Sequence, residues 1–142
     1  MRKWASVLTI VIGIAIFAGA VGTWILTSTT LSNQRITVAD DADCLAGRPV
    51  SGPLSAYCQA KIIEKHTLAQ TGGKTYAELD RDDPLRQVAM NSSFLQASLF
   101  TSVLAFGVAG LAGLAGVLFI LIGLGMKDVA ERTGALEESK PT

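Results

Sequence analysis

Residues 87–126 contain no Asp, Glu, Lys or Arg, and this uncharged stretch constrains the fold more than any other feature of the chain. Its inner part, 99–126, is almost wholly Leu, Ala, Gly, Val, Ile and Phe. As an α-helix that part would extend about 42 Å, against about 30 Å for the hydrocarbon core of a bilayer. Lipid offers no partner for backbone N–H and C=O groups, so a segment buried in it must be helical. We therefore predict a transmembrane helix that tilts or projects beyond the membrane on one side.

A second apolar stretch, residues 4–26, follows the basic pair Arg2 and Lys3. It has two interpretations: a cleaved signal peptide, with 18–20 as a cleavage site of small residues, or an uncleaved signal anchor. The apolar run continues past that site, beyond the roughly 7–15 residues usual for the hydrophobic region of a signal peptide. We therefore favour the anchor, which gives the chain two transmembrane helices.

Basic residues at the ends of the two helices predict their orientation in the plasma membrane. Arg2 and Lys3 precede the first helix, and Lys127 and Arg132 follow the second. Cytoplasmic flanks carry the excess of Lys and Arg, so both termini are expected in the cytoplasm. In chain order we predict a cytoplasmic N-terminus (1–3), a first transmembrane helix (4–27), an extracytoplasmic domain (28–93), a second transmembrane helix (94–126) and a cytoplasmic tail (127–142).

The two cysteines of the chain, Cys44 and Cys58, both lie in the predicted extracytoplasmic domain. Disulfides form and persist on that side of the membrane. Closing a loop of about 15 residues would stabilise the fold by roughly 3 kcal/mol, which matters for a domain with little core of its own. We predict a Cys44–Cys58 disulfide; the alternative is a pair of unrelated buried thiols. Two cysteines without a neighbouring histidine are too few for a structural zinc site.

The predicted extracytoplasmic domain has recognisable local signals along its first part. Residues 35–38 are a short β-favouring run, expected to be extended, and 40–52 are rich in Asp, Gly and Pro and should form a loop. Residues 53–70 predict a helix, because their apolar side chains recur at helical spacing. Gly72 and Gly73 give that helix a natural C-terminal stop.

Capping signals precede the second long helix. Thr75 and Glu78 have the spacing of a capping box and predict a brief helical turn. Asp83 before Pro84 places an N-cap residue ahead of a proline at the first helical position. We expect the helix to run unbroken from Pro84 to about residue 126. The polar tail, 127–142, should extend it briefly and then be disordered.

Small residues recur at every fourth position in both predicted membrane helices. Such residues let helix backbones approach closely and are enriched where transmembrane helices pack. They support packing of a helical hairpin and, alternatively, a second face for another protein; Gly and Ala are also simply common in membrane helices. The helix-packing candidates are Ala15 and Gly19 in the first helix, followed by Thr23, and Ala105, Ala109, Ala112, Gly113 and Gly116 in the second.

Side chains suited to catalysis or metal binding are scarce. His66 is the only histidine and has no second His or Cys nearby in sequence. Two acidic clusters could in principle hold Ca²⁺, but they lack the order of an EF-hand loop, so solvated loops with capping Asp residues are expected. The clusters are Asp40, Asp41 and Asp43, and Asp80, Asp82 and Asp83. We predict no catalytic, cofactor-binding or metal-binding residue, no cofactor, no small-molecule substrate and no enzyme activity.

Charge excludes further classes of function. The formal net charge is zero, with 12 basic and 12 acidic residues, so no basic stripe is available for nucleic acid. Neither predicted span contains an ionisable residue. Intramembrane charges usually mark ion paths and proton relays, so their absence argues against a transporter, channel or pump built from this chain alone.

Several short motifs resemble small two-span membrane proteins of actinobacteria. They are Arg35-Ile36-Thr37-Val38, the run from Gly73 to Asp80, Asp83-Pro84-Leu85-Arg86, Ser93-Phe94-Leu95 and the run from Ser98 to Val103. Proteins of this kind often carry an automatic label as aromatic ring-opening dioxygenases. A non-haem iron dioxygenase needs several His and carboxylate ligands, and this chain has one histidine. We therefore carry over no site from that label.

The sequence thus predicts a mainly α membrane protein: a two-transmembrane-helix hairpin with a small, mostly helical, disulfide-stapled extracytoplasmic loop domain. The expected role is an accessory or stabilising subunit of a larger respiratory or cell-envelope complex, in contact with the lipid bilayer and larger membrane-protein partners. The alternative is an independent membrane-anchored sensor or ligand-binding ectodomain, which requires a concave pocket within residues 44–83. An enzyme or metal protein using His66 and the acidic clusters is a third possibility.

Overall fold

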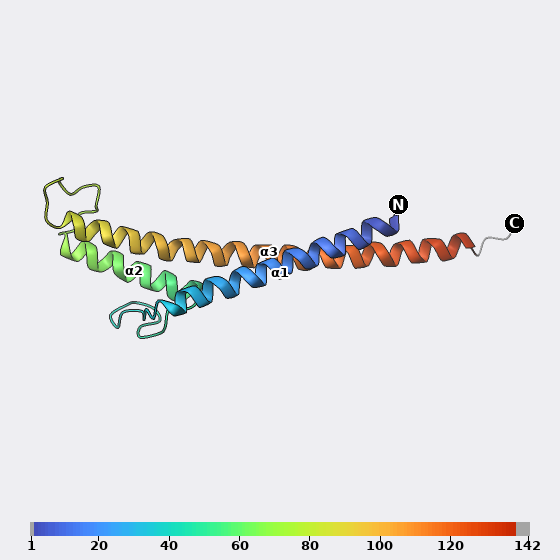
Figure 1. Cartoon of the computed structure of the whole chain (residues 1–142), viewed down its shortest axis with the longest axis horizontal. Coiled ribbons are helices and arrows are strands. Elements are labelled where there is room, and N and C mark those ends of the chain that lie inside the picture. Colours follow the sequence, from blue (N-terminus) through green and yellow to red (C-terminus); the bar gives the residue numbers. More distant parts are fainter. Residues whose placement is uncertain (1, 139–142) are drawn as a thin grey trace. The chain divides into compact units, whose positions relative to one another are not determined.

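Three helices form most of the computed structural model, which describes residues 2–138 (Figure 1). They are α1 (Arg2–Asn33), α2 (Pro53–Gln70) and α3 (Arg86–Glu138). Within residues 2–138 there is no strand, and one isolated antiparallel bridge pairs Thr37 with Pro49. The predicted mainly α fold class is confirmed. The chain divides into two compact units: unit 1 is Met1–Trp24 with Val108–Thr142, and unit 2 is Ile25–Gly107.

Helices α1 and α3 are both long and apolar enough to cross a membrane. The qualifying segments are Trp4–Asn33 and Arg86–Thr133, with mean hydropathies of 2.3 and 2.4. Only 17% of the most apolar window of each is buried inside the protein. These helices therefore depend on their surroundings, more than on each other, to cover their apolar side chains.

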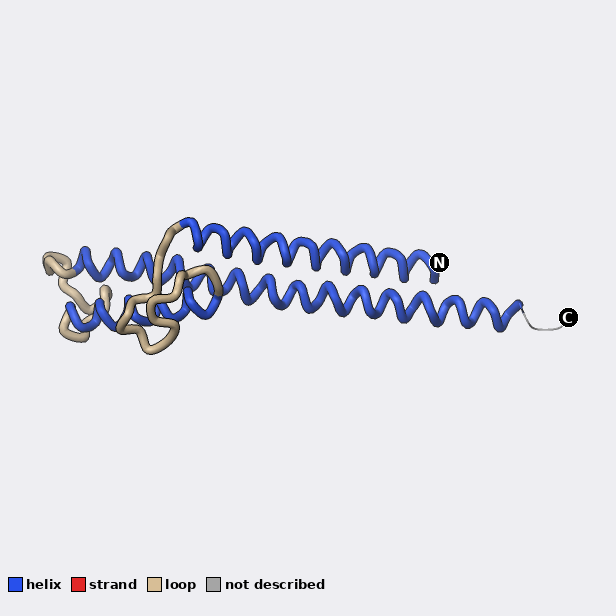
Figure 2. The backbone as a smooth tube through the Cα atoms, turned by 90° about the horizontal axis from the view of Figure 1, so that it is seen from below, coloured by secondary structure: helices blue, strands red, loops and turns tan. Residues whose placement is uncertain are grey.

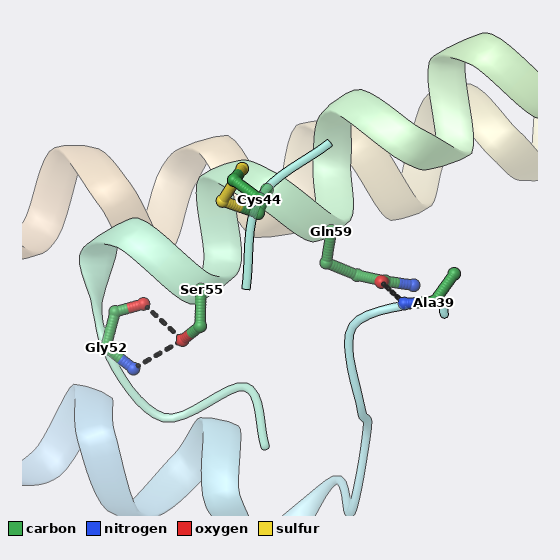
Figure 3. Close-up of a disulfide and its surroundings, with 6 residues drawn as sticks. Ala39, Cys44, Gly52, Ser55 and Gln59 are labelled. Carbon is green, nitrogen blue, oxygen red and sulfur yellow. Dashed lines mark hydrogen bonds between the residues drawn. A yellow bond between two sulfur atoms is a disulfide. The ribbon is translucent and has the colours of Figure 1, made fainter. Parts of the chain in front are cut away.

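Helix α2 has the bounds that the sequence predicts, because local signals define both of its ends. Pro53 occupies the first helical position, and the Ser55 hydroxyl accepts the Gly52 N–H and donates to the Gly52 carbonyl, both at 3.1 Å (Figure 3). At the other end Gly72 adopts a left-handed φ of 65°. The Gly73 N–H then donates to the Leu68 carbonyl at 2.7 Å, which completes a Schellman motif. The predicted glycine stop is confirmed.

The segment between α1 and α2 folds back on itself through backbone hydrogen bonds. The Val38 N–H donates to the Arg48 carbonyl and the Val50 N–H to the Ile36 carbonyl, both at 2.9 Å. The Gln59 side-chain oxygen of α2 accepts the Ala39 N–H at 3.1 Å (Figure 3). The loop at 40–52 is confirmed, and so is the extended run at 36–38. Arg35, predicted to be part of that run, instead lies in a turn with a left-handed φ of 54°.

A disulfide joins this loop to the first turns of α2. Cys44 and Cys58 are bonded with their Cα atoms 5.7 Å apart, as Figure 3 shows beside Ser55 and Gln59. The prediction is confirmed, and the alternative of two unrelated thiols is wrong. Cys58 is almost fully buried in the core of unit 2. That core consists of Leu31, Val38, Val50, Ala56, Cys58, Ala60, Leu99 and Phe106.

Within unit 2, α2 lies alongside the first part of α3, as both views of the backbone show (Figures 1 and 2). The hydroxyls of Thr67 and Ser92 hydrogen-bond to each other. The Tyr57 and Phe100 rings meet edge to face with centroids 6.2 Å apart. Contacts at both ends of α2 therefore fix it along α3.

The start of α3 follows the predicted capping pattern with a small shift. The Asp83 carboxylate accepts the Leu85 N–H at 2.8 Å, and the helix begins at Arg86, two residues after Pro84. The segment at Thr75 forms a hydrogen-bonded turn and not a helix, with the Glu78 carboxylate accepting the Thr75 N–H at 2.8 Å. Helix α3 continues to Glu138, as expected for the first part of the tail. Residues 139–142, expected to be disordered, lie outside the described residues.

Candidate functional site

Unit 1 is an antiparallel pair of helix segments that meet through small residues. Positions on α1 from Ser6 to Ala20 face positions on α3 in reverse order. A Cβ atom at Gly123 would meet Ser6 and Ile10, one at Gly116 would meet Gly13 and Phe17, and one at Gly113 would meet Ala20. The buried small residues recur at every seventh position on both helices. They are Ser6, Gly13 and Ala20 on α1, and Ala109, Gly116 and Gly123 on α3.

The two backbones touch at the centre of this pair. A Cβ atom at Gly116 would lie 2.8 Å from the Gly13 carbonyl oxygen and 2.8 Å from the Phe17 nitrogen. A Cβ atom at Gly123 would lie 3.0 Å from the Ser6 carbonyl oxygen. These distances leave no room for a side chain, so glycine is required for the helices to approach this closely.

The structure brings together only some of the predicted helix-packing residues. Ala109, Gly113 and Gly116 lie in the contact between the helices, and Ala105 and Ala112 are half-buried. Ala15 is exposed, and a Cβ atom at Gly19 would meet no atom of α3 within 4 Å, so neither takes part in the pairing. A role for these two in binding another protein stays a prediction. Ser6, Gly13, Ala20 and Gly123 were not among the predicted helix-packing residues, although a seven-residue repeat of small residues would have indicated them.

The outer surface of unit 1 is apolar. Large apolar side chains on the outer sides of both helix segments are exposed, including Leu8, Val11, Ile14, Leu111, Leu118 and Leu121. The two tryptophans of the chain are also exposed, one near each end of the α1 segment: Trp4 (81%) and Trp24 (43%). About 30 Å of helix separates them at roughly 1.5 Å per residue, which equals the thickness of a hydrocarbon core.

A depression of about 450 Å³ lies beside the disulfide in unit 2. Ion pairs border it: the Lys61 ammonium donates to Glu64 at 2.5 Å, and Lys65 lies 3.5 Å from Asp43. The bond to Glu64 raises the pKa of Lys61. The residues that line the depression are Asp43, Cys44, Cys58, Lys61, Ile62, Glu64, Lys65 and Leu68. All of these residues except Asp43 lie within 44–83, the region where a ligand-binding ectodomain would need a concave pocket.

His66 pairs with the first acidic cluster. Its Nε2 lies 2.6 Å from the Asp41 carboxylate, and this hydrogen bond lowers the pKa of Asp41. The pair connects α2 to the loop 40–52, as does the ion pair between Lys65 and Asp43. Both are exposed side-chain contacts between a helix and a loop.

The described residues contain no group of three or more His, Cys, Asp or Glu side chains placed to hold a metal ion. Members of the two acidic clusters serve local structure instead. Asp83 accepts the Leu85 N–H in the turn that precedes α3, Asp41 hydrogen-bonds to His66 of α2, and Asp43 forms an ion pair with Lys65 of α2.

Comparison with known protein families, with curated proteins and with solved structures finds no match. The resemblance to small two-span actinobacterial membrane proteins stays a prediction. The functional assignment therefore depends on the apolar helix surfaces and on the disulfide-bonded unit.

Proposed function

We propose that this chain is a non-enzymatic integral membrane protein of two transmembrane helices. It acts as an accessory or stabilising subunit of a larger membrane assembly, such as a respiratory or cell-envelope complex. The observation that carries the proposal is the apolar exterior of unit 1, where most side chains of α1 and α3 face outward. Leaving such a surface in water would cost roughly 25 cal/mol for each Å².

The two tryptophans support a defined position in the bilayer. Trp is enriched at both membrane–water interfaces, where its ring sits among the head groups. Trp4 and Trp24 are exposed and lie about one hydrocarbon thickness apart along α1. The bilayer core then covers the part of α1 between them and the facing part of α3.

The disulfide supports placing unit 2 outside the cytoplasm. Cys44 and Cys58 are bonded, and disulfides persist in the oxidising space beyond the plasma membrane. Arg2 and Lys3 before the first span, with Lys127 and Arg132 after the second, agree with cytoplasmic termini. The first span is then retained as an anchor.

An exposed small-residue face on α1 supports a larger membrane partner. Ala15 is exposed, and Gly19 and Gly22 have open space where a side chain would stand. Because the pairing of α1 with α3 uses Gly13 on another side of the helix, this face is free for close approach by a helix of another protein.

Purification of the full chain from native membranes in mild detergent, with and without crosslinking, tests this role. We expect larger membrane proteins to co-purify at fixed stoichiometry. Gly19→Leu should abolish their recovery, whereas Gly107→Leu, at a position on α3 with equally open space, should not. Recovery of the chain alone, as monomer or dimer, would contradict the accessory role.

Thiol labelling tests the topology separately. An impermeant maleimide applied to intact cells should label Cys44 and Cys58 only after reduction. Labelling that requires disruption of the membrane, or that occurs without reduction, would contradict the extracytoplasmic position of unit 2.

The depression beside the disulfide supports a second candidate function, a ligand-binding ectodomain. A binder should raise the unfolding temperature of the protein, and Lys61→Ala with Lys65→Ala should remove that shift. Screening of charged metabolites by thermal shift would identify such a ligand; a screen without any hit abolished by these substitutions would count against this function.

A further inference from the structure

Unit 2 exposes a contiguous apolar patch across α2 and α3. Leu54 and Tyr57 lie about one turn apart on α2, and Phe100 and Leu104 lie about one turn apart on α3. The Tyr57 and Phe100 rings meet edge to face and join the two halves. The exposed fractions of these side chains run from 40% for Phe100 to 66% for Leu104. We call Leu54, Tyr57, Phe100 and Leu104 the junction patch.

The junction patch lies at the end of unit 2 from which the chain continues into unit 1. Unit 2 begins at Ile25 and ends at Gly107, so these two residues are its covalent connections. Ser28, about one turn after Ile25, donates its hydroxyl to the Ser51 carbonyl at 2.8 Å, which holds the start of α2 beside α1 within unit 2. Leu104 lies about one turn before Gly107 on α3. Both connections therefore leave unit 2 beside the junction patch.

Away from this end the exposed side of α2 becomes polar. Leu54 and Tyr57 are exposed in its first turns, whereas Lys61, Lys65 and His66 are exposed further along. Tyr is enriched at membrane interfaces, where its ring lies at the level of the head groups, and Lys side chains there extend toward water. The order of side chains along α2 is therefore the order expected of a helix whose first turns meet a lipid surface.

We propose that the junction patch lies against the extracytoplasmic surface of the bilayer, with Leu54 and Leu104 at the boundary between head groups and acyl chains. This inference rests on the proposed membrane position of the two long helices. Because both helices connect to unit 2 beside the patch, the chain itself holds the patch at the lipid surface. An interfacial position covers the apolar side chains and leaves the charged part of α2 in water.

Fluorescence quenching of the full chain in lipid nanodiscs tests this contact. A lipid with a nitroxide on its acyl chain quenches fluorophores that lie in or close to the hydrocarbon. The native cysteines are bonded to each other, so a fluorophore can be attached to one introduced thiol. Leu54→Cys reports on the patch, and Ala69→Cys, exposed at the other end of α2, is its control. Leu104→Cys and Phe94→Cys form a second pair: both side chains are apolar and 66% exposed, but Phe94 lies about 15 Å further from Gly107 along α3.

We expect several-fold stronger quenching at Leu54→Cys and Leu104→Cys than at their controls. Equal quenching within either pair, or none at the patch, would overturn the proposal. Shielding of Leu54→Cys from a water-soluble thiol reagent without quenching by lipid would mean that a protein covers the patch, and would overturn it as well.

The tryptophans of the unlabelled wild-type chain test the underlying membrane position in the same nanodiscs. Trp4 and Trp24 both lie in unit 1, and the nitroxide lipid should quench their fluorescence. Quenching of the tryptophans without quenching at the junction patch would contradict this inference alone. Absence of quenching at both would contradict the proposed membrane position together with the inference.

Discussion

Units 1 and 2 are stabilised in opposite ways. Unit 1 has almost no side-chain core, and its helices touch backbone to backbone at Gly13 and Gly116. Unit 2 has a core of interlocking side chains around Phe106, a disulfide and hydrogen bonds between its loop and α2. Most large apolar side chains of unit 1 point outward, whereas unit 2 buries a side-chain core and leaves other apolar side chains exposed, such as Leu54, Phe94 and Leu104.

This contrast is the difference expected between two solvents. In lipid, apolar side chains gain little by turning inward, so helix association depends on close backbone packing of small residues. In water, burial of apolar area is the main stabilising term, and a small unit benefits from a disulfide. The two regions therefore support the proposed division between membrane and aqueous space, and the following predictions test it from the largest expected effect to the smallest.

Truncation of an aromatic side chain should give the largest difference in stability loss between the two units. Phe106 is 1% exposed in unit 2, and Phe119 is 42% exposed in unit 1. Phe106→Ala should lower the free energy of unfolding by about 3–5 kcal/mol, because it removes transfer free energy and leaves a cavity. Phe119→Ala should cost far less in a detergent micelle. Equal losses, measured by denaturant titration in the same detergent, would break the comparison.

Removal of the disulfide should destabilise unit 2 alone. Cys44→Ala with Cys58→Ala opens a loop of about 15 residues and should cost about 3 kcal/mol in the chain-entropy model. Amide hydrogen exchange should accelerate in α2 and the loop 40–52. Exchange in the unit 1 parts of α1 and α3 serves as the internal control, and acceleration there would show that the two units are not independently stabilised.

Addition of a single methyl group should disturb unit 1 at the glycine contact. Gly116→Ala places a Cβ against backbone atoms of α1, and overpacking of this kind costs about 1–3 kcal/mol. Gly110→Ala meets open space on the same helix and should be neutral or slightly stabilising. Energy transfer between probes on α1 and α3 would measure the separation of the helices. No change for Gly116→Ala would contradict the backbone contact.

The smallest effect concerns the turn at Thr75. Its N–H and hydroxyl donate to the Glu78 carboxylate and lower the pKa of Glu78 below its ordinary 4.5. Because the pKa of Glu78 is lower in the folded than in the unfolded state, its ionised form stabilises the fold at pH values above the ordinary pKa. This contribution is lost as the pH falls through the pKa of the folded state. Thr75→Ala removes the hydroxyl donor and should raise the pKa of Glu78 toward 4.5. Titration of Glu78 by NMR would measure it, and an unchanged pKa would show that the hydroxyl bond is absent in solution.

Features governed by neighbouring residues could be predicted from the sequence. The bounds of α2 depend on Pro53 and on Gly72, and both signals are local. The Cys44–Cys58 disulfide followed from the presence of only two cysteines in one segment. The hydrogen-bonding role of Asp83 ahead of α3 was recognised because its position before Pro84 is a local pattern, although the helix begins at Arg86 and not at Pro84.

Features that depend on two segments at once could not be predicted as well. Periodicity within α1 favoured Ala15 and Gly19, but the register with α3 selects Ser6, Gly13 and Ala20. The end of α1 could not be predicted either, because the polar residues after Leu26 end the apolar run but do not end the helix. Thr29 and Thr30 remain within α1, and their hydroxyls donate to carbonyls one turn earlier, at Ile25 and Leu26.

Two further features could not be predicted from the sequence: the pairing of His66 with Asp41 and the depression beside the disulfide. Both depend on the loop folding back against α2, and residues so far apart in sequence carry no shared local signal. The partner of His66 is a single carboxylate, Asp41, which belongs to the first acidic cluster.

The position of the two cysteines sets an order of events during biosynthesis. Both precede α3, so under the proposed topology the covalent ring around residues 44–58 can close outside the cell while the last helix is still being made. Leu99 and Phe106 of α3 then meet a partner surface that is already restrained. Under this order, α3 would pack against a loop and helix α2 that the disulfide already holds together. In a cell unable to oxidise the two cysteines, α3 would meet a loop that is not fixed to α2.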